Sequence, residues 1–230
     1  MSTHRLPGLN RLLEVVGKNG LRVETLPPRS TPPHAGEHLY GMPVDPLLAT
    51  AFSSCGKLLI EGRGAERLLL VRRDDEVDGF LSENREWQSY FPHEFWPEHF
   101  RTLLLFGGEM LYRYATVPEL ANSEGRQPVV RVDPYEEIHA LPVASGVDRF
   151  FDTYSRYIEL MVNDQGYQSD GISWVRFPYD VPELIAEDEA LIDMIKEGRF
   201  DRLMYERDKT GWRDESVVAS TRDWVGRLIR

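Results

Sequence analysis

The chain has 230 residues, of which 41% are hydrophobic and 28% are charged, and its formal net charge is −11. This length and composition are typical of a globular protein with one domain, or with one domain and an appendage. The negative charge argues against non-specific nucleic-acid binding, because phosphates would be repelled, and it favours encounter with a basic partner. An acidic surface also serves solubility alone, and composition does not choose between these two roles.

Three features lead us to expect a cytoplasmic protein that does not contact a membrane. The one cysteine, Cys55, cannot form an internal disulfide, which suits a reducing compartment. No apolar run approaches the ~18 residues that a membrane span needs. Residues 1–10 lack the apolar core and the cleavage pattern of a signal peptide.

The first part of the chain predicts two helices and then a hairpin. Apolar residues recur at helical spacing over residues 9–16 and 44–52, and a proline-rich connector lies between these segments. Gly56 ends the second helix, and beyond it the period shortens. Residues 57–61 and 67–72 are short apolar runs separated by glycines, which indicates a β-hairpin.

The middle of the chain predicts four more strands and a long helix. Residues 103–106 and 110–115 flank a glycine pair, which is typical of a hairpin turn. Residues 128–133 and 137–141 are further strand candidates, and residues 147–161 have the apolar spacing of an amphipathic helix. Helices followed by strands and then a helix predict an α+β fold rather than alternating βαβ units.

Beyond residue 163 the sequence changes character. A polar, glycine-containing segment is followed by three stretches of helical character: residues 183–196, 200–205 and 217–229. We therefore predict two parts. Residues 1–163 form an α+β domain with a mainly antiparallel sheet wrapped by helices, and residues 164–230 form a helical C-terminal extension packed on or next to it.

Three motifs in a fixed order resemble a known family. Residues 40–56 (YGMPVDPLLATAFSSCG) have a glycine and a proline that lead into a helix ending near a glycine, and strands follow. Residues 106–112 (FGGEMLY) have a glycine pair before a strand that ends in an aromatic residue. Residues 128–133 (PVVRVD) and 143–151 (VASGVDRFF) pair a strand with a valine-alanine-serine step before an aromatic helix. In this order and spacing they resemble the SUKH superfamily.

The resemblance covers roughly residues 9–162, and it implies a single antiparallel sheet wrapped by helices. Many bacterial members of the superfamily are immunity proteins that bind and neutralise a cognate toxin, often a nuclease, and fungal members regulate cell-wall assembly by binding proteins. The resemblance thus implies a non-catalytic protein-binding module, with a basic toxin domain as one such partner. Residues 72–99 match no pattern of the superfamily, and residues 164–230 lie outside its usual domain.

Two alternative functions remain open. The first is a metal-dependent enzyme that uses His93, Glu98 and His99. Zinc sites need imidazoles and carboxylates that converge on one point, and the usual helical form spaces two histidines by four residues. Here the spacing is six and Pro97 interrupts the helix, so we expect no metal site. The second alternative is a structural adaptor that self-associates through its helical tail.

Other reactive residues also fit a non-catalytic protein. Glu136 and Glu137 would point to opposite faces of a strand, so they would not converge for acid–base chemistry. Cys55 stands at a helix C-terminus, where the helix dipole disfavours a thiolate. We predict no catalytic residue and no cofactor. The alternating acids of residues 74–78 could bind calcium through oxygen ligands, although the rest of the calcium-loop pattern is missing.

The acidic and aromatic segment from residue 74 to residue 98 is the predicted partner-binding site. Clustered acids steer a basic partner, and aromatic side chains anchor interfaces because they bury a large area at low entropic cost. Aromatic residues equally fill cores. The residues assigned to this site are Asp74, Asp75, Glu76, Asp78, Glu83, Glu86, Trp87, Tyr90 and Trp96.

Overall fold

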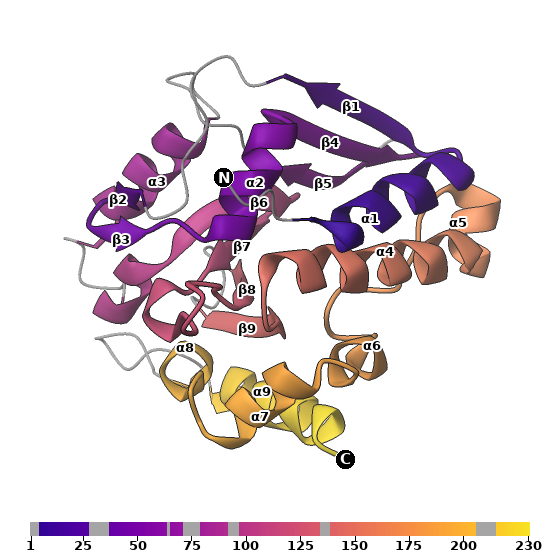
Figure 1. Cartoon of the computed structure of the whole chain (residues 1–230). Helices are drawn as coiled ribbons and strands as arrows, with labels where there is room; N and C mark the ends of the chain where they lie inside the picture. Colours follow the sequence, from indigo (N-terminus) through magenta and orange to yellow (C-terminus); the bar gives the residue numbers. More distant parts are fainter. Residues whose placement is uncertain are drawn as a thin grey trace.

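The computed structural model describes residues 5–27, 37–63, 65–70, 79–91, 97–133, 139–205 and 215–230 (Figure 1). Within these residues, seven strands form one sheet in which spatial order follows chain order and every neighbouring pair is antiparallel. The strands are β1 Arg22–Leu26, β4 Lys57–Gly62, β5 Ala65–Leu70, β6 Leu104–Glu109, β7 Tyr112–Thr116, β8 Val129–Asp133 and β9 His139–Ala144. The predicted α+β class with a mainly antiparallel sheet is confirmed.

Two further strands, β2 His38–Leu39 and β3 Met42–Pro43, form a separate short ribbon. The helices of the described residues are α1 Pro7–Lys18, α2 Pro46–Ser54, α3 Phe80–Ser89, α4 Val147–Asn163, α5 Gln165–Asp170, α6 Pro182–Ala186, α7 Glu189–Lys196, α8 Asp201–Tyr205 and α9 Glu215–Leu228, with 3₁₀ turns η1 Glu98–Thr102 and η2 Pro118–Leu120. No helix in this part of the chain is long and apolar enough to cross a membrane.

Helix α4 lies along the sheet and carries α1 beside it (Figure 1). The two helices come from opposite ends of the predicted domain, and a carboxylate joins them. Asp148 in the first turn of α4 accepts hydrogen bonds from the backbone amides of Gly8 and Leu9 at the start of α1. A negative group at a helix N-terminus satisfies free amides and complements the helix dipole, so α4 fixes where α1 begins.

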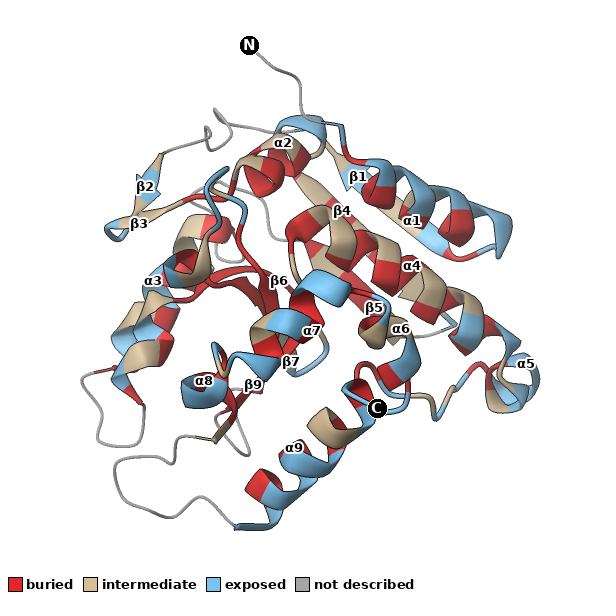
Figure 2. Cartoon of the chain, turned by 60° about the horizontal axis from the view of Figure 1, so that its bottom comes forward, coloured by how far each residue is buried: buried red, intermediate tan, exposed pale blue. Residues whose placement is uncertain are grey.

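The helices after residue 163 share the core of the sheet. Helices α7 and α8 contact β9, and α9 contacts α6 and α8. Phe177, between α5 and α6, packs with its ring 5.3 Å from the rings of Tyr154 and Tyr157 on α4. Figure 2 shows buried residues continuing from the sheet into these helices. Trp224 of α9 is buried there too, so the apolar side of the helical tail packs against its own chain.

Two local predictions are wrong. Gly107 and Gly108, predicted as a hairpin turn, lie inside β6, and the chain turns at Met110, which has a φ of 51°. A Cβ at Gly107 would lie 2.6 Å from the carbonyl oxygen of Leu69, so the neighbouring strand requires glycine there. The single helix predicted over residues 183–196 is two helices, because Asp188 caps a new N-terminus at α7.

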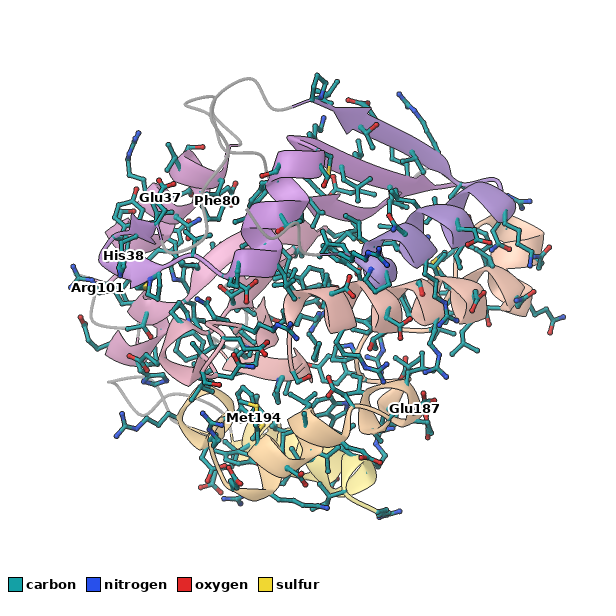
Figure 3. The ribbon with its side chains drawn as sticks, in the orientation of Figure 1. Glu37, His38, Phe80, Arg101, Glu187 and Met194 are labelled. Atoms are coloured by element: carbon teal, nitrogen blue, oxygen red, sulfur yellow. The ribbon has the colours of Figure 1, made fainter. Side chains whose placement is uncertain are left out.

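Strand β1 and helix α3 were not predicted, for different reasons. Strand β1 is an edge strand without a fully buried side chain, so it has no apolar alternation to detect. Helix α3 lies over β6 and beside the β2–β3 ribbon, where the Tyr40 hydroxyl donates to the carbonyl of Leu81. Figure 3 labels Glu37, His38 and Phe80 in this part of the molecule.

Candidate functional site

The predicted partner-binding segment is described only in part. Glu83, Glu86 and Trp87 lie on α3, and Tyr90 follows its last turn. The remaining members of the predicted site, Asp74, Asp75, Glu76, Asp78 and Trp96, lie outside the described residues, as do His93, Glu136 and Glu137. The acids of residues 74–78, Trp96 and the candidate reactive residues His93, Glu136 and Glu137 therefore stay sequence-based predictions.

Trp87 is a core residue, which corrects its assignment as an exposed anchor. Its side chain is 2% exposed, and its indole N–H donates to the carbonyl oxygen of Phe100 at 3.0 Å. Its ring meets the ring of Phe91 edge-on at 5.6 Å. Together with Phe80 and Asn84 it forms the buried side of α3. A side chain already desolvated in the fold gains nothing further from contact with a partner.

The outer side of α3 is acidic and engaged in local contacts. Glu86 is exposed and accepts a hydrogen bond of 2.6 Å from the hydroxyl of Tyr90. Glu83 lies 3.4 Å from the guanidinium of Arg113 on β7. These three site residues therefore stay at or near the surface, while Trp87 does not.

The other described reactive residues are engaged in local contacts. Glu98 pairs with Arg101 at 3.2 Å, and His99 lies against the ring of Phe100. Burial raises the pKa of Cys55 to about 11, so its thiol stays protonated at neutral pH. His139 is buried with its Nε2 atom 3.2 Å from the hydroxyl of Tyr179. The described residues contain no group of three or more histidine, cysteine or acidic side chains placed to hold a metal.

A half-buried acid, Glu109, lies between the sheet and α4. Glu109 accepts hydrogen bonds from the hydroxyls of Tyr154 at 2.8 Å and Tyr114 at 3.1 Å. Burial raises the pKa of Glu109, although these hydrogen bonds and the nearby arginines oppose the effect. Arg131 stacks 3.3 Å above the ring of Tyr112 in the same layer. This cluster is enclosed by α4 and the Phe177 segment, so it serves the interior of the fold.

The segment of residues 171–176, here called the Trp174 loop, carries Trp174, the most exposed large apolar side chain of the described residues, followed by Met110 and Leu111 in the β6–β7 turn. Trp174 is 80% exposed and Ile172 is 56% exposed. Burying apolar area is what stabilises most protein interfaces, and tryptophan is strongly enriched among residues that dominate binding energy. Sequence reasoning missed Trp174. The available signal was a tryptophan at the end of a polar, glycine-containing segment, outside every predicted helix and strand.

The Trp174 loop is tied to α4 by one hydrogen bond and is braced by local contacts of its own. The Tyr157 hydroxyl of α4 donates to the carbonyl oxygen of Val175 at 3.1 Å, and the Ser173 hydroxyl accepts from the Val175 amide. Arg176 pairs with Asp180 at 3.2 Å where the loop ends. An exposed tryptophan on a fixed loop loses little further conformational freedom when it is covered.

Comparisons with protein-family models, with curated proteins and with solved structures found no match to this chain.

Proposed function

We propose that this chain is a non-catalytic protein-binding module, of the immunity type that neutralises a cognate toxin. The observation that carries the protein-binding part is Trp174, an 80% exposed tryptophan on a loop fixed by hydrogen bonds. The immunity-type part rests on the resemblance of residues 40–56, 106–112, 128–133 and 143–151 to the SUKH superfamily.

The energetics favour Trp174 as the centre of the interface. A tryptophan side chain buries roughly 200 Å² when it is fully covered, which at about 25 cal/mol/Å² corresponds to about 5 kcal/mol of gross transfer free energy. Part of this is offset by ordering at the interface, and the fixed loop keeps that loss small. Ile172, two residues away and also exposed, extends the apolar surface.

Charge favours a basic partner. The formal net charge of the chain is −11, so long-range attraction would accelerate its encounter with a positively charged domain. Near the Trp174 loop, Asp164 and Asp170 bracket α5. A rim of charges around an apolar centre is the usual anatomy of a specific interface. The acids of residues 74–78 remain a second proposed source of attraction.

The test compares three forms of the full chain: the unchanged protein, Trp174→Ala and Ile229→Ala. Ile229 is the control, since it is an apolar residue 44% exposed that lies outside the Trp174 loop, after α9. Proteins retained by the tagged unchanged chain are purified, and their affinities for the three forms are measured by calorimetry. We expect Trp174→Ala to weaken binding of the partner by about 2 kcal/mol or more, which raises Kd about 30-fold.

The immunity-type part has its own measurement. The purified partner is produced in cells with each form of the chain, and cell survival is counted. We expect the unchanged chain and Ile229→Ala to protect, and Trp174→Ala to protect poorly. A partner that is harmless by itself would overturn the immunity part alone. A partner that binds Trp174→Ala as tightly as the unchanged chain would overturn the assignment of the interface to the Trp174 loop.

A further inference from the structure

An arginine-lined cleft opens where three helices approach one another. Its volume is about 1080 Å³, and its walls come from the start of α1, the start of α4 and one side of α7. Met194 lines it from α7, which lies below α4 in the orientation of Figure 3. Five arginines line it: Arg5, Arg11, Arg126, Arg149 and Arg199.

The cleft is positive although the whole chain is strongly negative. Its lining has five arginines and two acids, Asp148 and Asp152, which leaves a formal charge of 5 − 2 = +3. Both acids are already engaged. Asp148 accepts from the amides of α1, and Asp152 lies 3.0 Å from both Arg11 and Arg149. Acids outside the lining also pair with three of the arginines: Glu159 with Arg11, Glu124 with Arg126 and Asp188 with Arg149. The positive charge that is left for a ligand therefore lies on Arg5 and Arg199.

Two of the arginines make no ion pair or side-chain hydrogen bond with any other described residue. These are Arg5, which precedes α1, and Arg199, which follows α7. A third, Arg126, pairs with Glu124, whose side chain is largely exposed and does not line the cleft. Guanidinium groups bind phosphate and carboxylate through two parallel N–H donors, so unpaired arginines around one cavity can converge on an anion.

The start of α4 adds backbone donors to the same cleft. Ser145 and Gly146 line it, and no described side chain caps this 17-residue helix at Gly146. Asp188 accepts from the Ser145 amide at 2.7 Å and lies 3.9 Å from Arg149, so it neutralises part of this corner. The first amides of an uncapped helix carry partial positive charge and favour anions.

We propose that this cleft binds a small organic phosphate. Its volume suits a small molecule rather than a folded partner. Arg5, Arg199 and the start of α4 supply donors for a multiply charged group, and a phosphate carries close to two negative charges at neutral pH. Apolar walls from Leu47, Leu120 and Met194 offer contact for the organic part of the ligand. This site is separate from the Trp174 loop and does not depend on the proposed function.

The test measures binding of pyrophosphate and of ATP to the full chain by calorimetry in magnesium-free buffer at low salt. Inorganic sulfate is the reference anion. We expect pyrophosphate to bind at least ten-fold more tightly than sulfate, because it can contact several donors together. We expect ATP to bind more tightly than pyrophosphate, because its organic part contacts the apolar walls. Each affinity should fall with added salt.

Variants locate the site. The double variant Arg5→Gln, Arg199→Gln should weaken pyrophosphate by ten-fold or more and keep the circular dichroism spectrum of the unchanged chain. Arg85→Gln, an exposed arginine on α3, should bind like the unchanged chain, and so should Trp174→Ala. Equal affinity for sulfate and pyrophosphate, or unchanged binding by the double variant, would overturn the site. If ATP binds no more tightly than pyrophosphate, the claim that the apolar walls contact an organic part of the ligand is overturned.

Discussion

Two tryptophans of this chain occupy opposite environments. Trp87 on α3 is 2% exposed and donates its indole N–H inside the fold, whereas Trp174 is 80% exposed on a loop. Trp87 stands in a stretch dense with aromatic residues and acids, and Trp174 stands between Ser173 and Val175, three residues before Phe177. The dense stretch is the more conspicuous in the sequence, yet its helix turns that tryptophan inward. Local aromatic density therefore does not show which of the two tryptophans is exposed.

The largest expected effect that tests this contrast is the loss of folding stability when Trp87 of α3 is replaced. Trp87→Ala should lower the free energy of unfolding by about 3–5 kcal/mol, because it leaves a large cavity and removes the indole hydrogen bond to Phe100. Denaturant unfolding followed by circular dichroism measures this. Trp87→Phe keeps most of the ring and should lose much less. A cost below about 1 kcal/mol for the alanine variant would mean that Trp87 is not a core residue.

The second effect concerns how α3 is attached to the sheet. Asn84 is 1% exposed, and its side chain accepts from the amide of Leu105 and donates to the carbonyl of the same residue. Strand β5 pairs with β6 only at Gly107 and Gly108 among the described residues. Asn84 therefore satisfies the backbone of β6 where β5 no longer does.

Asn84→Ala should cost about 2 kcal/mol, since it leaves two buried backbone groups without partners. Hydrogen exchange at the Leu105 amide should accelerate in the same variant. Glu86→Ala lies on the exposed side of the same helix and should change stability by less than about 0.5 kcal/mol. Equal exchange at Leu105 in both variants would contradict the role given to Asn84.

Sequence reasoning reached the fold further than it reached the site. The buried stripes of α1, α2 and α4 have clear helical periods, and β4–β9 include short apolar runs bounded by glycines and prolines, so the α+β class followed from them. Strand β1 has no buried stripe, and the acidic side of α3 concealed its helical period. The position of Gly107 depends on a backbone approach from β5, which spacing cannot reveal.

The site was harder to predict because binding surfaces have no period. Whether a tryptophan faces inward depends on the elements that pack over it, and these lie far away in the sequence. The cleft likewise brings Arg5 and Arg199 together from opposite ends of the chain. Neither residue belongs to a local motif, so only the folded arrangement places them around one cavity.

The third effect is a pH dependence of folding stability that comes from Glu109, near the segment that follows the Trp174 loop. Phe177 packs on Tyr154, and the Tyr154 hydroxyl contacts both Glu109 and the carbonyl of Arg67. That hydroxyl has one proton, so when it donates to Arg67, a protonated Glu109 can donate to it. This arrangement agrees with the raised pKa of Glu109, which is due to burial.

Because folding raises the pKa of Glu109 above its ordinary value of 4.5, the folded chain binds this proton more tightly than the unfolded chain does. The resulting stabilisation is complete below the unfolded pKa and is lost as pH rises through the folded pKa. Glu109→Gln stays neutral, so its stability relative to the unchanged chain should rise with pH. Urea unfolding between pH 4 and pH 8 measures the difference.

Glu187 provides a control of opposite sign. A hydrogen bond from Arg156 lowers the pKa of this exposed carboxyl, so its contribution is present above the unfolded pKa and disappears in acid. Glu187→Gln should therefore differ from the unchanged chain at neutral pH and approach it as the pH falls. Parallel pH profiles for Glu109→Gln and the unchanged chain would contradict the assignment of a shifted carboxyl under the loop.

The smallest expected effect on stability is at Trp174. Trp174→Ala should change the free energy of unfolding by less than about 0.5 kcal/mol, because a side chain that is 80% exposed leaves almost no cavity when it is truncated. Gly166 lies close to it, since a Cβ there would be only 3.4 Å from the indole ring, so a small packing loss is included in that estimate.

Quenching of tryptophan fluorescence by acrylamide supplies a second measurement. Trp174→Phe should remove an accessible emission, whereas Trp87→Phe should remove a protected one. If Trp174→Ala costs as much stability as Trp87→Ala, the indole is a structural group, and the contrast on which the proposed interface depends fails. If it costs almost nothing, a tryptophan is held in water by a loop that is itself fixed, and binding remains the use for which that arrangement is suited.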